Sequence, residues 1–275
     1  MSGLIDTHAH LHDRAFNSDR ADMLARAREA GLDAIVTVGT DRTESEAAIA
    51  VARTEPDIFA TVGLHPHDAK DWDDALRTRC ATLASDPKVV AIGEIGLDYY
   101  RNLSPRPAQE RAFREQLELA NELRLPVVVH AREADEETAA ILDEWALSAT
   151  CGHPIGVLHC YAGDVALAYR YTELGFLISI AGPVTYPKSE RIRAVATTVS
   201  AEALVVETDA PYLTPQPWRG QRNESAYVVE TARYIAKLRG ADADELADQC
   251  GENARRLFRL PAAQSLTQSV KGAPA

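Results

Sequence analysis

Short apolar segments alternate with stretches of helical spacing along most of this chain. The apolar segments are rich in β-branched residues and occur at 4–6, 33–39, 59–65, 89–96, 126–131, 156–160, 176–182 and 203–209. Helical spacing appears between them, for example at 18–31, where Ser18 is a plausible N-cap and Gly31 a stop, and at 43–56 and 109–124. Eight strand and helix units over 275 residues predict an α/β fold, the (β/α)8 or TIM barrel.

An open doubly wound sheet is the alternative fold for such an alternation. That fold normally places a glycine-rich phosphate turn after its first strand, whereas the first turn here reads H-A-H-L-H. A helix at about 224–239 follows the eighth apolar segment, and an extra C-terminal helix is predicted at 241–260, packed outside the barrel. We therefore expect one barrel domain over 1–260 and a disordered polar tail over 261–275.

Composition restricts the class of protein and its surroundings. The net charge of −12 argues against a protein that coats nucleic acid without regard to sequence, although it leaves room for a local basic cleft. Nothing resembles a signal peptide or a membrane span, so no membrane partner is expected, and no obligate protein partner is evident. The four cysteines are widely spaced without a C-x-x-C pair, which suits reduced thiols in the cytoplasm.

Histidine and acidic residues stand at or near the ends of the predicted strands. They are His8, His10, His65, Glu94, His130, His159, Glu207 and Asp209. In a parallel barrel these ends converge on one face, where catalytic residues of the fold collect. Buried imidazoles and carboxylates need a cation to remain compatible, so the set predicts a divalent metal site.

The remaining histidines have a simpler interpretation. A single histidine at a strand end is more often hydrogen-bonded or exposed than a ligand, and we assign that role to His12, His67 and His153. Asp6, His8 and His10 alternate, so they would point the same way if the first strand persists that far.

Six motifs occur in order along the chain. They read LIDTHAHLHD, TVGLHPHDA, AIGEIGLDYYR, PVVVHAREA, GVLHCYAG and LVVETDAPYLTPQPWRGQRNE. Together they resemble the motifs of the TatD family of metal-dependent deoxyribonucleases, within the amidohydrolase-like superfamily. The resemblance runs from about residue 4 to residue 258, and the ETDAPYLTP block is its most specific part.

The resemblance implies a two-metal phosphodiesterase. It implies supporting roles for His65 and Glu207, and metal ligands at His8, His10, Glu94, His130, His159 and Asp209. Tyr161, Ala162 and Ser225 depart from the Phe, Ser and Pro that are more usual in the family. These positions are expected in loops on the substrate side, so they bear on substrate preference and leave the metal site intact.

Roles within this set follow from metal chemistry. Ions about 3.5–4 Å apart need a shared oxygen ligand, so Glu94 is predicted to bridge them, and no lysine occurs in 126–132 to take that role. His8 and His10 then belong to one ion, and His130 and His159 to the other. Asp209 is predicted to bind the first ion and to accept a proton from bound water, which leaves a metal-activated hydroxide as the nucleophile.

Basic and aromatic residues supply candidates for substrate binding. His65 and Arg132 are candidates to hold a phosphate or protonate the leaving oxygen, although a rim salt bridge from Arg132 to Glu133 or Asp135 is an equal alternative. Arg219 and Arg222 are candidates for phosphates further along a strand. Tyr161 is a candidate for stacking on bases of single-stranded or frayed DNA, and its alternative role is packing.

Two other functions remain open at this level. A metal hydroxide also attacks carbonyl carbon, so the same site could hydrolyse an ester or amide, for example an aminoacyl-tRNA ester. A metal-stabilised scaffold without turnover is a further alternative, against which the complete ligand set argues. The residue types accept two Zn, Mn, Mg, Fe or Ni ions, so they do not select the metal.

Overall fold

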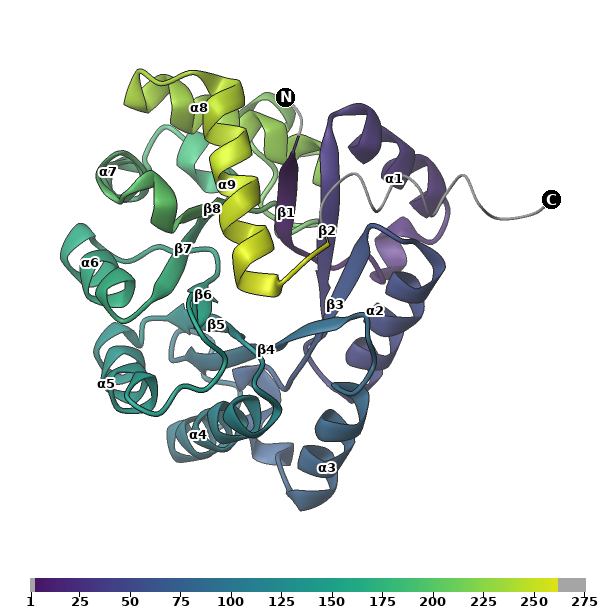
Figure 1. Cartoon of the computed structure of the whole chain (residues 1–275), viewed down its shortest axis with the longest axis vertical. Helices are drawn as coiled ribbons and strands as arrows, with labels where there is room; N and C mark the ends of the chain where they lie inside the picture. Colours follow the sequence, from purple (N-terminus) through teal and green to yellow (C-terminus); the bar gives the residue numbers. More distant parts are fainter. Residues whose placement is uncertain (1–2, 262–275) are drawn as a thin grey trace.

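The computed structural model describes residues 3–261, and its centre is a parallel eight-stranded sheet (Figure 1). The strands are β1 (Leu4–Ala9), β2 (Leu32–Val38), β3 (Ile58–Val62), β4 (Val89–Asp98), β5 (Val127–Arg132), β6 (Gly156–Leu158), β7 (Phe176–Ile180) and β8 (Leu204–Val206). Each strand pairs in parallel with the next one along the chain. The predicted (β/α)8 barrel is therefore confirmed.

Helices follow the strands and form the outer layer (Figure 1). They are α1 (Arg20–Glu29), α2 (Arg42–Thr54), α3 (Asp74–Leu83), α4 (Arg106–Leu123), α5 (Asp135–Ala146), α6 (Val165–Glu173), α7 (Glu190–Thr198), α8 (Val228–Arg239) and α9 (Ala243–Phe258). Several begin where the sequence offers an acidic cap: the Asp41 side chain, for instance, accepts from the Glu44 amide at the start of α2. Helix α1 begins after Asp19, so the predicted N-cap at Ser18 is wrong by one residue.

The barrel closes between β1 and the segment that follows β8. The Asp209 amide donates to the His8 carbonyl at 2.8 Å, and the His10 amide donates to the Ala210 carbonyl at 2.7 Å. Ala9 and Ala210 form a parallel bridge at the same place. This closure lies at the carboxyl ends of the strands, and it brings the two chain segments that carry His8, His10 and Asp209 together.

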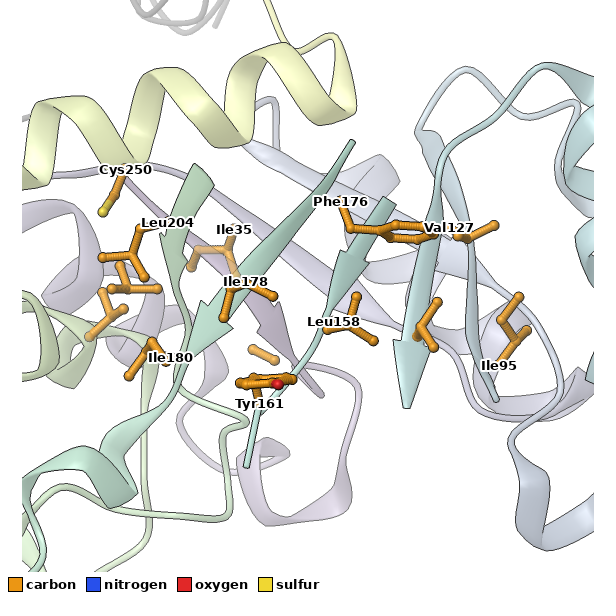
Figure 2. Close-up of a cluster of buried hydrophobic side chains, with 14 of the residues drawn as sticks. Ile35, Ile95, Val127, Leu158, Tyr161, Phe176, Ile178, Ile180, Leu204 and Cys250 are labelled. Atoms are coloured by element: carbon orange, nitrogen blue, oxygen red, sulfur yellow. The ribbon is translucent and has the colours of Figure 1, made fainter. Parts of the chain in front are cut away.

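The two faces of the sheet build two apolar layers. The outer face packs against the helices, and Figure 2 shows part of this layer, including Ile178, Leu158 and Phe176 on neighbouring strands. The inner face contributes residues such as Val36, Val128 and Val205 to a second cluster in the barrel interior. Both layers exclude water, which is the main favourable contribution to folding.

Helix α9 lies across the amino end of the barrel (Figure 1). Its Leu257 and Phe258 belong to the same cluster as the inward-facing strand residues, while its Cys250 projects toward Leu204 in Figure 2. The side-chain amide of Asn253 donates to the backbone carbonyls of Ala201 and Leu204. The extra helix therefore covers the amino end of the barrel, which we call its floor. Its side chains reach the barrel interior, whereas the prediction placed the helix outside the barrel.

The structure also bears on the predictions about cysteine pairing, membrane spans and the C-terminal tail. All four cysteines are unpaired, and no helix within residues 3–261 is long and apolar enough to cross a membrane. The predicted tail at 261–275 lies, except for Pro261, outside the described residues. The domain boundary at 260 stays a prediction.

Candidate metal centre

The six predicted metal ligands gather at the carboxyl mouth of the barrel, and they come from five strands or the residues just beyond them. They are His8 and His10 (β1), Glu94 (β4), His130 (β5), His159 (β6) and Asp209 (β8). The strands approach closely here: a Cβ on Gly96 would collide with the carbonyl oxygen of His130, so glycine lets β4 pass β5 beside the cluster.

Glu94 occupies the middle of the cluster. Its Oε1 lies 2.9 Å from His130 Nδ1, 3.0 Å from His159 Nε2 and 3.3 Å from His65 Nε2. Its Oε2 lies 3.4 Å from His8 Nε2. The two oxygens thus face different imidazoles, as a bridging carboxylate requires.

Asp209 forms the second acidic contact in the mouth. Its Oδ1 lies 3.4 Å from His10 Nε2 and 3.6 Å from His8 Nε2. These three side chains make one group with the spacing of a metal site. His8 thereby faces both Asp209 and Glu94.

His159 contacts more of the cluster than its predicted pairing with His130 indicates. Its Nε2 lies 3.3 Å from His130 Nδ1. Its ring also stacks on the ring of His8 at a centroid distance of 4.0 Å. One group with metal-site spacing joins His8, Glu94 and His159, and another joins His65, Glu94 and His130. His65 therefore stands as close to the carboxylate as the predicted ligands do.

Oxygen atoms lie close to the outer nitrogen of three rings, the nitrogen that faces away from the cluster. His10 Nδ1 lies 3.0 Å from the Val38 carbonyl, His130 Nε2 lies 3.4 Å from Asp98 Oδ2, and His159 Nδ1 lies 3.3 Å from Glu207 Oε1. With a proton on these outer nitrogens, the inner nitrogens present lone pairs to the centre.

Asp98 is a functional candidate that the sequence interpretation missed. It lies at the end of β4, and its carboxylate also accepts from the Arg101 amide and lies 2.9 Å from His67 Nε2. One signal was available, since Asp98 stands four residues after Glu94 and residues at even spacing on a strand share a face. Its partner His130 lies on another strand, so sequence spacing could not identify the contact.

Glu207 is fully buried behind His159. Its Oε1 accepts from the Cys160 amide at 2.6 Å, and its Oε2 accepts from the Ser179 hydroxyl at 2.6 Å. Both oxygens are thus engaged with protein groups. Glu207 thus lies beside His159, at a position compatible with the supporting role that the resemblance implies for it.

The residues present fit a divalent metal centre. His8 is fully buried, and neither of its ring nitrogens has a hydrogen-bond partner within residues 3–261. A buried polar nitrogen without a partner costs free energy, and a metal ion would remove that cost. Imidazole nitrogen and carboxylate oxygen are the donors that Zn²⁺ and similar ions accept.

Electrostatics support the same interpretation. Burial alone would raise the pKa of Glu94, but the positive charge of His159 and the hydrogen bonds from His130 and His159 hold the pKa of this carboxyl well below its usual range. For Asp209 burial acts in the same direction, and the hydrogen bond from His10 lowers its pKa overall. Both carboxylates are ionised near neutral pH and can attract cations.

Asp6 does not join His8 and His10. Its carboxylate accepts from the amide of Thr208 at 2.9 Å and from the Thr208 hydroxyl at 2.6 Å. The pairing of β1 with β2 shifts register between Asp6 and Ala9, which breaks the simple alternation. The predicted common direction of the three side chains is therefore wrong for Asp6, which ties β1 to the segment after β8.

An open pocket of about 310 Å³ adjoins the cluster. His130, His159 and Asp209 border it, and Arg132 lies at its edge. The guanidinium of Arg132 lies over the Tyr100 ring at 4.0 Å and has no ion pair within residues 3–261, so the rim salt bridge considered for it is not formed. Its five donors remain available to a phosphate.

The other predicted substrate residues have different surroundings. Tyr161 lines the pocket but is buried, and its hydroxyl donates to the Asp164 carbonyl at 2.8 Å, so it forms a wall and not an exposed stacking surface. Arg219 lies over the Tyr186 ring at 4.3 Å without an ion pair in the described chain. Ala162 also lines the pocket, whereas Ser225 is fully buried elsewhere.

Arg222 has a structural partner. Its two terminal nitrogens each lie 2.7 Å from an oxygen of Asp19, and it also donates to the Ala15 carbonyl. The guanidinium therefore joins the loop after β8 to the start of α1. Arg222 thus has protein partners in this structure, and its predicted phosphate contact stays a prediction.

Three histidines were predicted to be hydrogen-bonded or exposed and not to bind metal, and all three lie outside the cluster. His12 Nε2 lies 2.6 Å from Glu44, His67 Nε2 lies 2.9 Å from Asp98, and a Cβ on Gly175 would meet the His153 ring. None of them belongs to a group with metal-site spacing among the described residues.

Comparison with known proteins shows which family this chain resembles. Residues 5–259 match the family described as TatD related DNase. The chain is 38% identical over 257 residues to the "Uncharacterized metal-dependent hydrolase YabD" of Bacillus subtilis, covering 94% of this chain and 99% of that protein. It is 39% identical over 263 residues to the "3'-5' ssDNA/RNA exonuclease TatD" of Salmonella typhimurium, covering 94% and 99%.

A solved structure agrees in fold. The TatD homologue YJJV of Escherichia coli K12 superposes with a TM-score of 0.85 at 31% identity, covering 94% of this chain and 99% of that chain. The family description and the relative named as an exonuclease favour a nuclease over the ester or amide hydrolase. The chain therefore belongs to the TatD related DNase family and is a hydrolase of that family, as its motifs predicted.

Proposed function

We propose that this hydrolase cleaves phosphodiester bonds of DNA at a two-metal site in the mouth of the barrel. The observation that carries the proposal is the arrangement of imidazoles around both oxygens of Glu94, beside a pocket with an unpaired arginine. The family match and a relative named as an exonuclease support a nucleic-acid substrate.

The contacts favour two ions that share Glu94. One would be held by His8, His10 and Asp209, and the other by His130 and His159, with one Glu94 oxygen directed to each side. The donor types suit Zn, Mn, Mg, Fe or Ni, and the supply of metal in the cell decides among them. When bound, divalent ions polarise a phosphate oxygen and lower the pKa of water toward neutrality.

The chain's own side chains divide the remaining work. Asp209 borders the pocket with an ionised carboxylate, and this position suits it to accept a proton from an attacking water. Burial lowers the pKa of His65 to about 4, so its imidazole is neutral near pH 7. We therefore assign His65 to support of Glu94, and Arg132 to holding the scissile phosphate.

The substrate is proposed to enter as a single strand or a frayed end. The pocket beside the cluster is small, Glu94 is buried and Asp209 is only partly exposed, so a stacked duplex would need to open to bring a phosphate there. A relative named for single-stranded DNA and RNA supports this assignment. The unpaired cysteines are consistent with action in the cytoplasm.

One experiment tests the proposal. Metal-free protein, prepared by chelation and reloaded with Mg, Mn or Zn, is assayed side by side on single-stranded DNA, duplex DNA, RNA and an aminoacyl-tRNA ester. We expect metal-dependent release of nucleotides, fastest from single-stranded DNA. Efficient cleavage of the ester with no cleavage of nucleic acid by any reloaded form contradicts the proposal.

A further inference from the structure

The lining of the pocket beside the metal centre is of two chemical kinds. Three of the lining residues, His130, His159 and Asp209, belong to the metal cluster. Six others are apolar or aromatic: Tyr161, Ala162, Ala181, Pro183, Ile192 and Leu213. A phosphate held by the cluster would therefore have apolar lining available for the group next to it.

The apolar walls are already in place. The Tyr161 hydroxyl donates to the Asp164 carbonyl at 2.8 Å, and the Tyr161 amide donates to the Ser179 carbonyl at 3.0 Å. Between the lining residues Ala181 and Pro183, a Cβ on Gly182 would collide with the Leu213 carbonyl, so η3 (Gly182–Thr185) lies tightly against the loop after β8. A pocket whose walls are held in this way loses little entropy when a ligand enters.

We propose that this apolar pocket binds the base of the nucleotide that carries the scissile phosphate, an assignment that rests on the proposed nuclease function. A volume of about 310 Å³ is at the small end of ligand pockets, which suits one base with its sugar. Base faces pack well on aromatic and apolar side chains, and such contacts tolerate any base.

Charge fixes the orientation of the nucleotide in the pocket. Arg132 lines the pocket next to His130 in sequence, and its guanidinium rests on Tyr100 with no ion pair within residues 3–261, so it is the cation available to a phosphate. The phosphate cannot exchange places with the base, because the apolar wall offers it no donors and desolvation of its charge is costly. The pocket thus adds affinity through the base, while the metal side carries the chemistry.

Binding of small nucleotides tests this assignment without turnover. Calorimetry on the metal-loaded protein compares thymidine 5′-monophosphate with deoxyribose 5-phosphate, and thymidine 3′-monophosphate with deoxyribose 3-phosphate. Within each pair only the base differs, and using both pairs covers either direction of the strand. We expect the base to improve affinity roughly 5- to 150-fold in at least one pair, the range of one stacked base.

Pocket-filling variants locate that gain. Ala162→Phe changes an exposed lining residue, and Ala181→Leu changes a buried one. Either variant should remove the advantage of the base and leave the affinity for the sugar phosphates unchanged. Ala241→Phe, in the exposed connection between α8 and α9, is the matched control and should behave as the wild type.

The outcomes separate this inference from the proposed function. Equal affinity of the wild type for both members of both pairs overturns the base pocket, even if the enzyme degrades DNA. An unchanged base advantage in both folded pocket variants, checked by circular dichroism, overturns its location. A base advantage that the variants remove, in a protein that cleaves no nucleic acid, supports the pocket and contradicts the nuclease proposal.

Discussion

The carboxylate of Asp98 lies 3.4 Å from Nε2 of His130, on the opposite side of the ring from the Glu94 contact at Nδ1. This relationship predicts that Asp98 sets the metal affinity without touching the metal. Asp98→Asn should weaken metal binding roughly 10- to 100-fold, because the ring loses the negative charge beside its outer nitrogen, which raises the basicity of the inner one. Competition with a chelating dye measures the change.

His67 provides the control for that variant. It contacts the same carboxylate at 2.9 Å but lies outside the groups with metal-site spacing. His67→Gln should leave the metal affinity within a few-fold of the wild type. Wild-type metal affinity in Asp98→Asn would show that His130 does not depend on this contact.

Glu94→Gln tests the bridge. The change keeps the side-chain volume but removes the charge that faces both imidazole groups, so metal stoichiometry and turnover should both collapse while the fold persists. Plasma emission spectroscopy measures bound metal, and circular dichroism monitors the fold. Glu118→Gln, on the exposed side of α4, is the control. Hydrolysis at the wild-type rate by Glu94→Gln refutes the bridging role.

Arg132 and Arg219 form no ion pairs in the part of the chain that the structure describes. We therefore expect both to contribute to a salt-dependent interaction with a nucleic-acid strand. Arg132→Ala and Arg219→Ala should each weaken binding of an oligonucleotide and reduce the slope of log affinity against log salt by roughly one unit per lost phosphate contact. Fluorescence anisotropy over a salt series gives the slope. Arg124→Ala removes the same charge at the end of α4, and it should change neither quantity. A slope unaffected by both test variants excludes these arginines from binding.

Arg222 should act on stability instead of binding. It holds the pKa of Asp19 down to about 2, so its contribution is fully present above pH 4 and is lost as the pH falls toward 2. Arg222→Ala should lower the free energy of unfolding at pH 7 by about 1 kcal/mol or less, as for other partly exposed pairs.

Urea unfolding of wild type and Arg222→Ala at several pH values measures this. The difference between the two proteins should shrink on acidification, and Arg219→Ala should show no such difference. A difference that does not vary with pH would mean that Arg222 stabilises the fold by a contact other than Asp19.

Leu257 tests the floor of the barrel. It is fully buried in the cluster that α9 shares with the inner strand residues. Leu257→Ala should destabilise the protein by about 2–5 kcal/mol through lost burial and a residual cavity, without changing metal affinity. The urea midpoint reports this loss. Leu147→Ala is the control, since Leu147 is 90% exposed and should contribute less than about 0.5 kcal/mol.

The sequence by itself determined the barrel and most of the metal cluster. Apolar segments of strand length between helical stretches dictate local structure, and a parallel barrel brings every carboxyl strand end to one mouth. His8, Glu94 and His130 could therefore be predicted to meet, although they are far apart along the chain.

Tertiary structure alone decided the contacts that depend on register and on partners from distant segments. A register shift in β1 turns Asp6 toward Thr208, and the pairing of β4 with β5 sets Asp98 against His130. Asp19, from the segment before α1, pairs with Arg222 of the loop after β8. The physical reason is that periodicity fixes which face of an element a side chain occupies, whereas its partner depends on how separate elements pack.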